Sequence, residues 1–524
     1  MPAWLWIVVI LLLGVGLYDL LQKRHAILRN FPLLGHFRYL LESIGPELRQ
    51  YIVTSNDEER PFSRDQRRWV YATSKGQNDY FGFGTDNDLD LSPNYLFIKQ
   101  SGFPLSRSLG EPDYPIPCAK VLGQSRSRAR AFRVASVINV SAMSFGSLSG
   151  PAVEAINRGC AMAGALHNTG EGGIAPYHQQ GGDLIWQIGT GYFGCRDAQG
   201  QFDPIAFRDK VQANPGIKAI EIKLSQGAKA GLGGVVLASK VTPEIARIRG
   251  IPPWQSCFSP PGHSAFGDVD SLLDFVESLA AISGLPVGIK SAVGQMDFWE
   301  SLARHMAADQ RGVDFVTIDG AEGGTGAAPL VFSDHVALPF KQGFSRVYQT
   351  FYQHGLHEQV VFWGAGKLGF PDAAIMAFSL GCDGVMLARE AMLSIGCIQA
   401  QQCHTGKCPT GVATQNPWLK RGLDPSDKSL RLAQYLKTFR KEILRVCHAA
   451  GVVHPALMDS RHLEISDGQL GFRSIEEVFG YQKASRLVSL EKAQSVQEMM
   501  DALTKQGVDR TSRFQSHDSV SQSH

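Results

Sequence analysis

The chain has 524 residues, of which 44% are hydrophobic and 19% charged, and its formal net charge is +2. These fractions are those of an ordinary globular protein, and the near-neutral charge gives no indication of a nucleic-acid partner. Nine cysteines, an odd number in a long chain, do not suggest a disulfide framework. The length allows either several domains or one large barrel with additions.

The first predicted element is a membrane helix over residues 1–21. An uncharged apolar run, Trp4–Tyr18, is extended by Leu20 and Leu21, and a spanning helix needs about 20 such residues. No Lys or Arg precedes the run, whereas basic residues follow it within 22–29. The positive-inside rule then predicts a single-pass anchor in the cell inner (cytoplasmic) membrane with a cytoplasmic catalytic domain. A cleaved signal peptide is the alternative, disfavoured because a basic n-region and a small-residue cleavage site are missing.

Residues 22–134 read as an N-terminal extension or linker with a helical patch at Phe37–Tyr51. From about residue 135, short apolar runs alternate with helix-like stretches such as Ser271–Ile282 and Phe298–Ala308, a pattern typical of parallel α/β folds. The eight strand-like runs are Val137–Val140, Ala165–Asn168, Leu184–Ile188, Ala219–Lys223, Val287–Ser291, Phe315–Asp319, Val360–Gly364 and Gly384–Leu387.

Eight strand–helix units predict an α/β fold, a (β/α)8 TIM barrel over residues 135–428, with an open doubly wound sheet as the alternative. Residues 429–506 are predicted to be helical, including Ser429–Val446 and Leu490–Leu503. The polar tail 507–524 is predicted to be disordered. The fold class is therefore a barrel with an N-terminal transmembrane helix and helical N- and C-terminal extensions.

Polar or glycine-rich residues follow each predicted strand. They include Lys223 and Lys290 at the ends of apolar strands, where an unpaired buried charge would be costly. A barrel enzyme collects its catalytic side chains at the carboxyl ends of its strands. These residues therefore predict an active site at that face.

One glycine motif, Gly364–Gly369, follows a strand-like run and precedes a helix. It matches the dinucleotide pattern G-x-G-x-x-G, which on its own has low specificity. In a Rossmann fold this motif belongs to the first unit, whereas the loops after strands seven and eight of a barrel bind phosphate. Arg389 follows the eighth run and could pair with a phosphate through two hydrogen bonds. These loops favour a flavin mononucleotide phosphate over a dinucleotide.

Three cysteines, Cys397, Cys403 and Cys408, stand close together in one polar loop, 397–408. Thiolates at such spacings can wrap one iron–sulfur cluster, and three ligands suit [3Fe–4S]. Zinc held by the three cysteines and His404 is the alternative. Either interpretation requires a reducing compartment.

The motifs together resemble the FMN-binding, iron–sulfur synthase domain of the glutamate synthase family over about residues 135–420. The matching segments occur in the family's order, and the cysteine segment is the most specific. They are SAMSFGSLS (141–149), NTGEGG (168–173), EIKLSQGAKAGLGG (221–234), GGTGA (323–327) and GCIQAQQCHTGKCPTGVATQ (396–415).

The resemblance implies two cofactors, FMN and a [3Fe–4S] cluster, and a set of site residues. The cluster ligands are Cys397, Cys403 and Cys408. The residues implied to bind FMN are Ala142, Met143, Ser144, Asn168, Gln187, Lys290, Gly364, Gly366 and Arg389. Those implied in catalysis, with Lys290, are Glu171, Gln226, Lys229 and Arg249, which would contact 2-oxoglutarate; for Arg249 a solvated helix face is the alternative.

The implied reaction is the reductive amination of 2-oxoglutarate to glutamate by hydride from reduced FMN, with electrons arriving through the cluster. The electron donor would be ferredoxin, a reductase subunit or a membrane donor, because a separate NAD(P)H-binding half is not evident. A glutaminase domain is not evident either, so nitrogen would come from free ammonia or from a partner.

Departures from the family pattern leave the substrate open. Leu232 replaces an acidic residue, Ser259–Ser264 replaces a histidine-rich stretch, Glu322 stands in a segment without the family's histidine, and Met386 and Ala388 replace glycines. One alternative is therefore an FMN and iron–sulfur oxidoreductase with a different substrate. Another is a non-catalytic, membrane-anchored redox or assembly factor.

Overall fold

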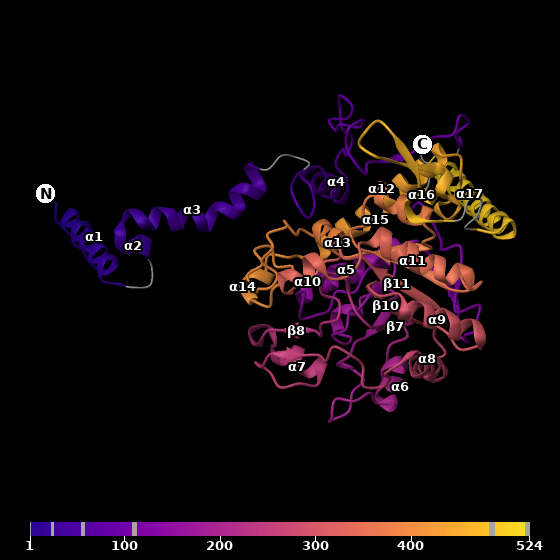
Figure 1. Ribbon diagram of the computed structural model, residues 1–524, viewed down its shortest axis with the longest axis horizontal. Coiled ribbons are helices and arrows are strands. Elements are labelled where there is room, and N and C mark those ends of the chain that lie inside the picture. The colour runs from indigo at the N-terminus through magenta and orange to yellow at the C-terminus, as the bar shows by residue number, and fades with distance from the viewer. Residues whose placement is uncertain (1, 23–25, 54–57, 107–112, 482–487, 519–524) are drawn as a thin grey trace. The chain divides into compact units, whose positions relative to one another are not determined.

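The computed structural model describes residues 2–22, 26–53, 58–106, 113–481 and 488–518, and for 506–518 it describes the backbone alone. The chain divides into two compact units, residues 1–69 and 70–524 (Figure 1). Helix α4 (Arg64–Ser74) contains the boundary between them. Each unit is described separately below.

The described residues of the first unit form α1 (Ala3–Leu21), α2 (Ala26–Asn30), α3 (Leu34–Leu48) and the first part of α4. A π-helical turn, Arg49–Val53, follows α3 and covers the end of the predicted helical patch. Helix α1 has 19 residues and is long and apolar enough to cross a membrane, a test that a signal sequence near an N-terminus also passes. The predicted apolar N-terminal helix is therefore present.

The second unit is built on a closed barrel of eight parallel strands (Figure 1). Every strand is buried along its whole length or nearly so, which explains why most of them are mainly apolar in sequence. The strands in chain order are β4 (Ile138–Val140), β5 (His167–Asn168), β6 (Leu184–Ile188), β7 (Ile217–Lys223), β10 (Val287–Ser291), β11 (Phe315–Asp319), β12 (Val361–Ala365) and β13 (Gly384–Leu387).

Pairing of the last strand with the first closes the barrel, with Val385 opposite Ile138. The predicted (β/α)8 barrel is confirmed, and the open sheet is excluded. The close approach of neighbouring strands explains one glycine inside a strand: a Cβ on Gly288 would lie 2.4 Å from the Phe315 ring.

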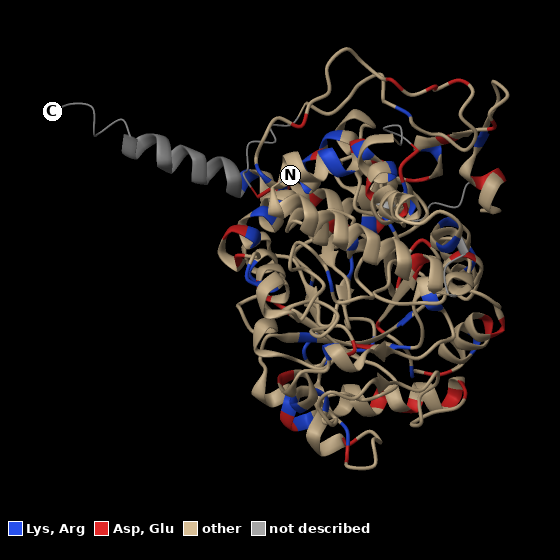
Figure 2. Cartoon of the chain, turned by 90° about the vertical axis from the view of Figure 1, so that its left-hand side faces the viewer, with Lys and Arg blue, Asp and Glu red and all other residues tan. Residues whose placement is uncertain are grey.

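Helices surround the barrel, and polar side chains cap the N-termini of several of them. Ser149, Thr242 and Asp268 each accept a hydrogen bond from a first-turn backbone N–H of the helix that follows. Basic residues, in blue, and acidic residues, in red, are interspersed along the helices (Figure 2). The helices are α5 (Gly150–Ala163), α6 (Pro204–Ala213), α7 (Pro243–Arg249), α8 (Val269–Ser283), α9 (Asp297–Ala308), α10 (Leu330–His335), α11 (Phe340–Gln353), α12 (Pro371–Ser379), α13 (Arg389–Ser394), α14 (Pro417–Lys420) and α15 (Pro425–Ala449).

The second unit also contains short antiparallel sheets outside the barrel. In one of them, β1 (Leu96–Ile98) pairs with β14 (Leu463–Ser466), which pairs with β15 (Phe472–Ser474). The segments predicted as an N-terminal extension and a C-terminal helical region therefore share a sheet. This sheet forms by pairing between residues that are far apart in the sequence, so local sequence patterns do not predict it. Two further pairs are β2 (Val121–Leu122) with β3 (Phe132–Arg133) and β8 (Val235–Val236) with β9 (Cys257–Phe258).

The C-terminal part is largely helical after α15, with α16 (Ile475–Phe479) and α17 (Leu490–Asp518). The backbone of residues 507–518, predicted as part of a disordered tail, belongs to α17. Its sequence contains neither proline nor, beyond Gly507, glycine, so nothing in it interrupts a helix. Residues 519–524 of that predicted tail lie outside the described residues.

Candidate active site

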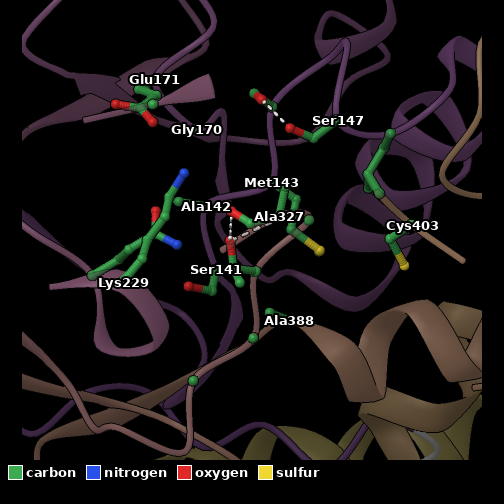
Figure 3. Close-up of a pocket in the computed structure, with 18 of the residues that line it drawn as sticks. Ser141, Ala142, Met143, Ser147, Gly170, Glu171, Lys229, Ala327, Ala388 and Cys403 are labelled. Atoms are coloured by element: carbon green, nitrogen blue, oxygen red, sulfur yellow. Dashed lines mark hydrogen bonds between the residues drawn. The ribbon is translucent and has the colours of Figure 1, made fainter. Parts of the chain in front are cut away.

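A pocket of about 230 Å³ opens at the carboxyl ends of the barrel strands. All eight strands, or the loops directly after them, contribute to its lining: Ser141–Ser144, Gly170 and Glu171, Gln187, Lys223, Lys290, Asp319, Ala365–Lys367 and Met386 with Ala388–Glu390. Figure 3 shows Glu171 and Lys229 on one side of the pocket and Cys403 on the other, with Met143 between them.

The charge of the lining is strongly basic, with seven Lys and Arg side chains and three Asp and Glu. Such an excess of cations raises the local concentration of anionic ligands. The whole chain is nearly neutral, so the pocket has a charge that the composition conceals. The arrangement is suited to binding phosphates and carboxylates.

At the end of β7, Lys223 forms an ion pair with Glu171. The Lys223 Nζ lies 2.6 Å from Glu171 Oε1 and also donates to Gln226 Oε1 at 2.8 Å. Burial alone would raise the pKa of Glu171, but the charges of Lys223, Lys229 and Arg249 outweigh it and lower that pKa. Glu171 is therefore held as a carboxylate within the basic pocket.

A second lysine ends β10 and lies beside the last residue of β11. The Lys290 Nζ is 3.3 Å from Asp319 Oδ2 and 3.3 Å from Ser141 Oγ. Lys290 is only 5% exposed, and Asp319 also accepts a hydrogen bond from the backbone N–H of Gly227. These partners satisfy the buried ammonium, which explains how two strand-end lysines are tolerated.

Two other cations in the pocket, Lys229 and Arg249, have N–H groups that could still bind a ligand. No hydrogen bond or ion pair joins the Lys229 ammonium, in the 3₁₀ turn Gly227–Lys229, to any residue that the structure describes. Burial and the charge of Lys223 lower the pKa of Lys229. Arg249, at the end of α7, donates from one terminal nitrogen to the carbonyl of Phe145 at 3.3 Å, and among the described residues its Nε has no hydrogen-bond partner.

Arg249 does not lie on a solvated helix face, because it is 3% exposed and its guanidinium stacks 5.1 Å from the centre of the Phe193 ring. Gly172 makes room for it, since a Cβ there would lie 2.9 Å from the guanidinium. The alternative reading of Arg249 is therefore wrong, and its position is that of a buried cation facing the pocket.

Below the pocket, Glu221 of β7 organises the barrel interior. Its Oε1 accepts hydrogen bonds from the side-chain amides of Asn168 and Gln187, both at 2.7 Å, and its Oε2 accepts from the Thr317 hydroxyl at 2.7 Å. Glu221 is fully buried. It fixes the orientation of Gln187, which lines the pocket, and it holds Asn168 outside the lining.

The loops after β11, β12 and β13 meet at one side of the pocket. Gly366 has φ +121°, and a Cβ there would lie 3.2 Å from the backbone N of Gly320. Arg389 donates to the carbonyl oxygen of Glu322 and lies so near Gly324 that a Cβ on that glycine would meet its Cδ at 2.7 Å. These glycines leave backbone groups exposed beside a guanidinium, the composition of a phosphate-binding cradle.

The cysteine loop borders the pocket through Cys403. Burial raises the pKa of the Cys403 thiol, and neighbouring Cys408 raises it further, while the Lys240 ammonium opposes both. All three loop cysteines have free thiols. Within the described ranges, no group of three or more His, Cys, Asp or Glu side chains is arranged as a metal site, for the predicted cluster or for zinc.

Most of the predicted site residues meet in the pocket. The lining includes Ala142, Met143, Ser144, Glu171, Gln187, Gln226, Lys229, Arg249, Lys290, Gly366, Arg389 and Cys403. Asn168, Gly364, Cys397 and Cys408 do not line it. Gly364 instead packs against the helix layer, because a Cβ there would lie 2.8 Å from Phe340 and from Leu368.

Sequence reasoning missed three polar residues around the site. Lys240 lines the pocket and donates to the carbonyl of Cys403 at 2.7 Å, and no local motif marks it. His263 bridges the Lys223 carbonyl at 2.9 Å and the Tyr192 hydroxyl at 3.1 Å. Glu221 carried the only usable signal: it is a lone acidic residue in the middle of an apolar strand.

Fold and pocket together define a (β/α)8 barrel enzyme with a basic ligand pocket at its carboxyl face. A protein-family model described as "Conserved region in glutamate synthase" matches residues 117–453. The glutamate synthase large subunit-like protein YerD of Bacillus subtilis is 37% identical over 490 residues, covering 87% of this chain and 92% of that protein. The chain belongs to the glutamate synthase family and is an oxidoreductase.

Two further comparisons cover a smaller part of this chain. The archaeal-type glutamate synthase (NADPH) of Thermotoga sp. strain RQ2 is 33% identical over 315 residues, and the match spans 59% of this chain and 58% of that protein. Among solved structures, a mandelate oxidase mutant with benzaldehyde covers 71% of this chain and 86% of its own, with a TM-score of 0.42 and 15% identity. A structural likeness of this size carries no argument about function.

Proposed function

We propose that this protein is an FMN-dependent oxidoreductase of the glutamate synthase type that reductively aminates 2-oxoglutarate to glutamate. The observation that carries the proposal is the pocket at the carboxyl face, where strand-end lysines, a phosphate-type cradle and two cations with free binding capacity meet. Family membership supports the same reaction class.

The residues around the pocket fit FMN. Gly366 and Arg389 would hold the phosphate, while Ala142, Met143 and Gln187 would contact the ring system. When bound, reduced FMN supplies a hydride to an electron-poor carbon. Lys290 places a buried positive charge among these residues, where it would stabilise negative charge on a reduced ring.

The substrate would be held by its carboxylates. Lys229 and the Nε of Arg249 are available for anions, and the planar guanidinium can pair with a carboxylate. The Lys223–Glu171–Gln226 network would fix the position of the reacting carbon without competing for the substrate charge. Ammonia and 2-oxoglutarate form an imine with loss of water, and addition of a hydride and a proton then gives glutamate.

We propose Cys397, Cys403 and Cys408 as the ligands of a [3Fe–4S] cluster. Their free thiols in one loop supply the donor chemistry, and the motif resemblance supports the cluster type. The described side chains are not gathered as a metal site, so no reaction step is derived through this group. Ferredoxin or a reductase subunit would supply the electrons.

We also propose that α1 anchors the protein in the inner membrane, with the barrel in the cytoplasm. The support is the length and apolar character of α1 together with the basic residues that follow it in the sequence. Recovery of the full-length protein in the membrane fraction after alkaline carbonate washing is the expected result, and recovery in the wash would refute the anchor.

The activity is tested with the purified full-length protein, a reduced dye, 2-oxoglutarate and ammonia. We expect glutamate to form, and we expect Lys229→Met to reduce its formation at low substrate while FMN content is kept. A protein that retains FMN but forms no glutamate at any substrate concentration would reject this substrate.

A second candidate has the same cofactors and a different 2-oxo acid. The apolar residues Val235 and Leu237 line the pocket and remain 40% and 46% exposed, and Leu232 nearby is 37% exposed. Such a rim favours a substrate with an apolar side group. The two candidates are distinguished with a panel of 2-oxo acids. Each acid is added with ammonia to the reduced enzyme, and oxidation of the enzyme is followed. The acid with the highest kcat/KM identifies the substrate class.

A further inference from the structure

Helix α3, in the first unit, is strongly amphipathic and its apolar face is exposed. The large apolar side chains recur at helical spacing, and they are 39–76% exposed. Arg38 and Glu42 form an ion pair of 2.9 Å along one flank of this face, and Ser43 lies on the polar side of the helix. The residues of the apolar face are Leu34, Phe37, Leu41, Ile44 and Leu48.

The start of α3 is fixed to the end of α1 by a buried carboxylate. Asp19, in the last turn of α1, is fully buried, although the rest of that helix is largely exposed. Its carboxyl oxygens accept hydrogen bonds from the backbone N–H of Leu33 at 3.1 Å and from His36 Nε2 at 2.9 and 3.0 Å.

One glycine allows α2 and α3 to pack closely. A Cβ on Gly35 would lie 2.9 Å from the side chain of Leu28 in α2. The start of α3 is therefore held by Asp19 at the end of α1 and by close packing against α2. Figure 1 shows these helices as consecutive elements at the indigo end of the chain.

We infer that α3 is an interfacial helix whose apolar face lies in the headgroup region of the bilayer that α1 is proposed to span. This rests on the proposed anchoring through α1. A helix of 19 residues is about 28 Å long at 1.5 Å per residue, which matches a hydrocarbon core of about 30 Å. Asp19 therefore lies at the edge of that core, and α3 begins there.

The lipid surface is favoured over a protein partner by continuity. Both helices expose apolar side chains, and the hydrogen bonds of Asp19 place the start of α3 at the end of α1. The ion pair of α3 flanks the apolar face, where a charged pair at the boundary with water is typical of helices that rest on membranes. A second copy of this chain or the chain's own barrel are the other occupants that the experiment distinguishes.

The experiment uses the full-length protein in membranes of the expressing cell. The photoreactive residue p-benzoylphenylalanine replaces Leu41 on the apolar face, Ser43 on the polar face or Ile10 within α1, one position at a time. After irradiation, mass spectrometry identifies the molecule attached to each position. We expect lipid adducts at positions 10 and 41 and several-fold fewer at position 43.

Each other outcome has a defined meaning. A lipid adduct at position 10 without one at 41 overturns the interfacial helix and leaves the anchor standing. A protein adduct at 41 also overturns it, and the attached peptide shows whether a second copy or another protein covers the face. The absence of lipid adducts at position 10 rejects the anchor, and the inference fails with it.

The role of the junction is tested separately. Asp19→Ala removes the acceptor for Leu33 and His36, so we expect the lipid adduct at position 41 to fall several-fold while that at position 10 is unchanged. Asp19→Asn keeps an acceptor oxygen and is expected to retain the adduct. An unchanged yield at position 41 in Asp19→Ala would overturn the assignment of Asp19 as the residue that positions α3.

Discussion

Glu221 offers the sharpest test of how the barrel interior supports the pocket. The substitution Glu221→Ala removes the acceptor of three hydrogen bonds, two from side-chain amides and one from the Thr317 hydroxyl, all at 2.7 Å and all buried. Glu221→Gln is the matched variant, because it keeps the size and can keep the two hydrogen bonds from the amides. Its carbonyl oxygen can accept from both amides, but its amide nitrogen cannot accept from the Thr317 hydroxyl.

The magnitude follows from the number of donors left without a partner. A buried donor without an acceptor costs about 1–3 kcal/mol, so three of them cost about 3–9 kcal/mol, with water entry reducing the loss toward the lower figure. Glu221→Gln removes the acceptor of the Thr317 hydroxyl alone, so it is expected to cost about 1–3 kcal/mol and to keep the larger part of the stability. A change of the exposed Glu300 on α9 to Ala serves as a surface control, expected within about 1 kcal/mol.

The assay is urea unfolding of the detergent-solubilised chain, followed by tryptophan fluorescence, together with the FMN content of each variant. We expect Glu221→Ala to lose both stability and FMN, because Gln187 is no longer held, and Glu221→Gln to retain FMN and the larger part of the stability. If Glu221→Ala unfolds at the same urea concentration as the control, the interior network does not stabilise the barrel as argued.

Three further outcomes are expected. Lys229→Met should raise the KM for the 2-oxo acid about 10–100-fold with an unchanged melting temperature, since one charged hydrogen bond is lost; an unchanged KM would remove Lys229 from the binding site. Cys403→Ala should abolish bound iron while Cys257→Ala retains it, and equal iron in both would reject the cluster assignment. Burial lowers the pKa of His454 to about 4. As the pH falls from about 6.5, this histidine is therefore protonated in the unfolded chain before it is protonated in the folded one. About 3 kcal/mol of stability is lost toward pH 4 for this reason. His454→Gln should remove that dependence in unfolding titrations and the exposed His335→Gln should not; equal slopes would contradict the role of His454.

The barrel could be predicted from the sequence because its strands are buried on both faces. Most strands appear as short, mainly apolar runs, and runs such as Leu184–Ile188 and Phe315–Asp319 coincide with β6 and β11 residue for residue. The polar residues that end these strands also fell in the pocket as expected, because parallel strands bring their carboxyl ends to one face.

The remaining features depend on contacts between distant segments. The pairing of β1 with β14 joins residues at opposite ends of the second unit, and no local pattern encodes it. The amide of Asn168 donates to Glu221 on β7, a partner 53 residues away that no local pattern predicts, and its contact with the flavin stays a prediction. Lys240 reaches the cysteine loop through a backbone carbonyl, an acceptor that every residue type offers and that leaves no trace in the sequence.

The closure of the barrel between β4 and β13 has a consequence for how the protein is made. Ser141 follows β4 and Arg389 follows β13, at opposite ends of the barrel segment, and they reach the same pocket only after Ile138 and Val385 have paired. A nascent chain that has emerged only as far as the end of β12 can therefore carry five of the pocket's seven basic residues and still lack the wall that Arg389 supplies. Until β13 is added, the edges of β4 and β12 remain unpaired, so synthesis passes through a stage that is open to aggregation and unable to trap a ligand.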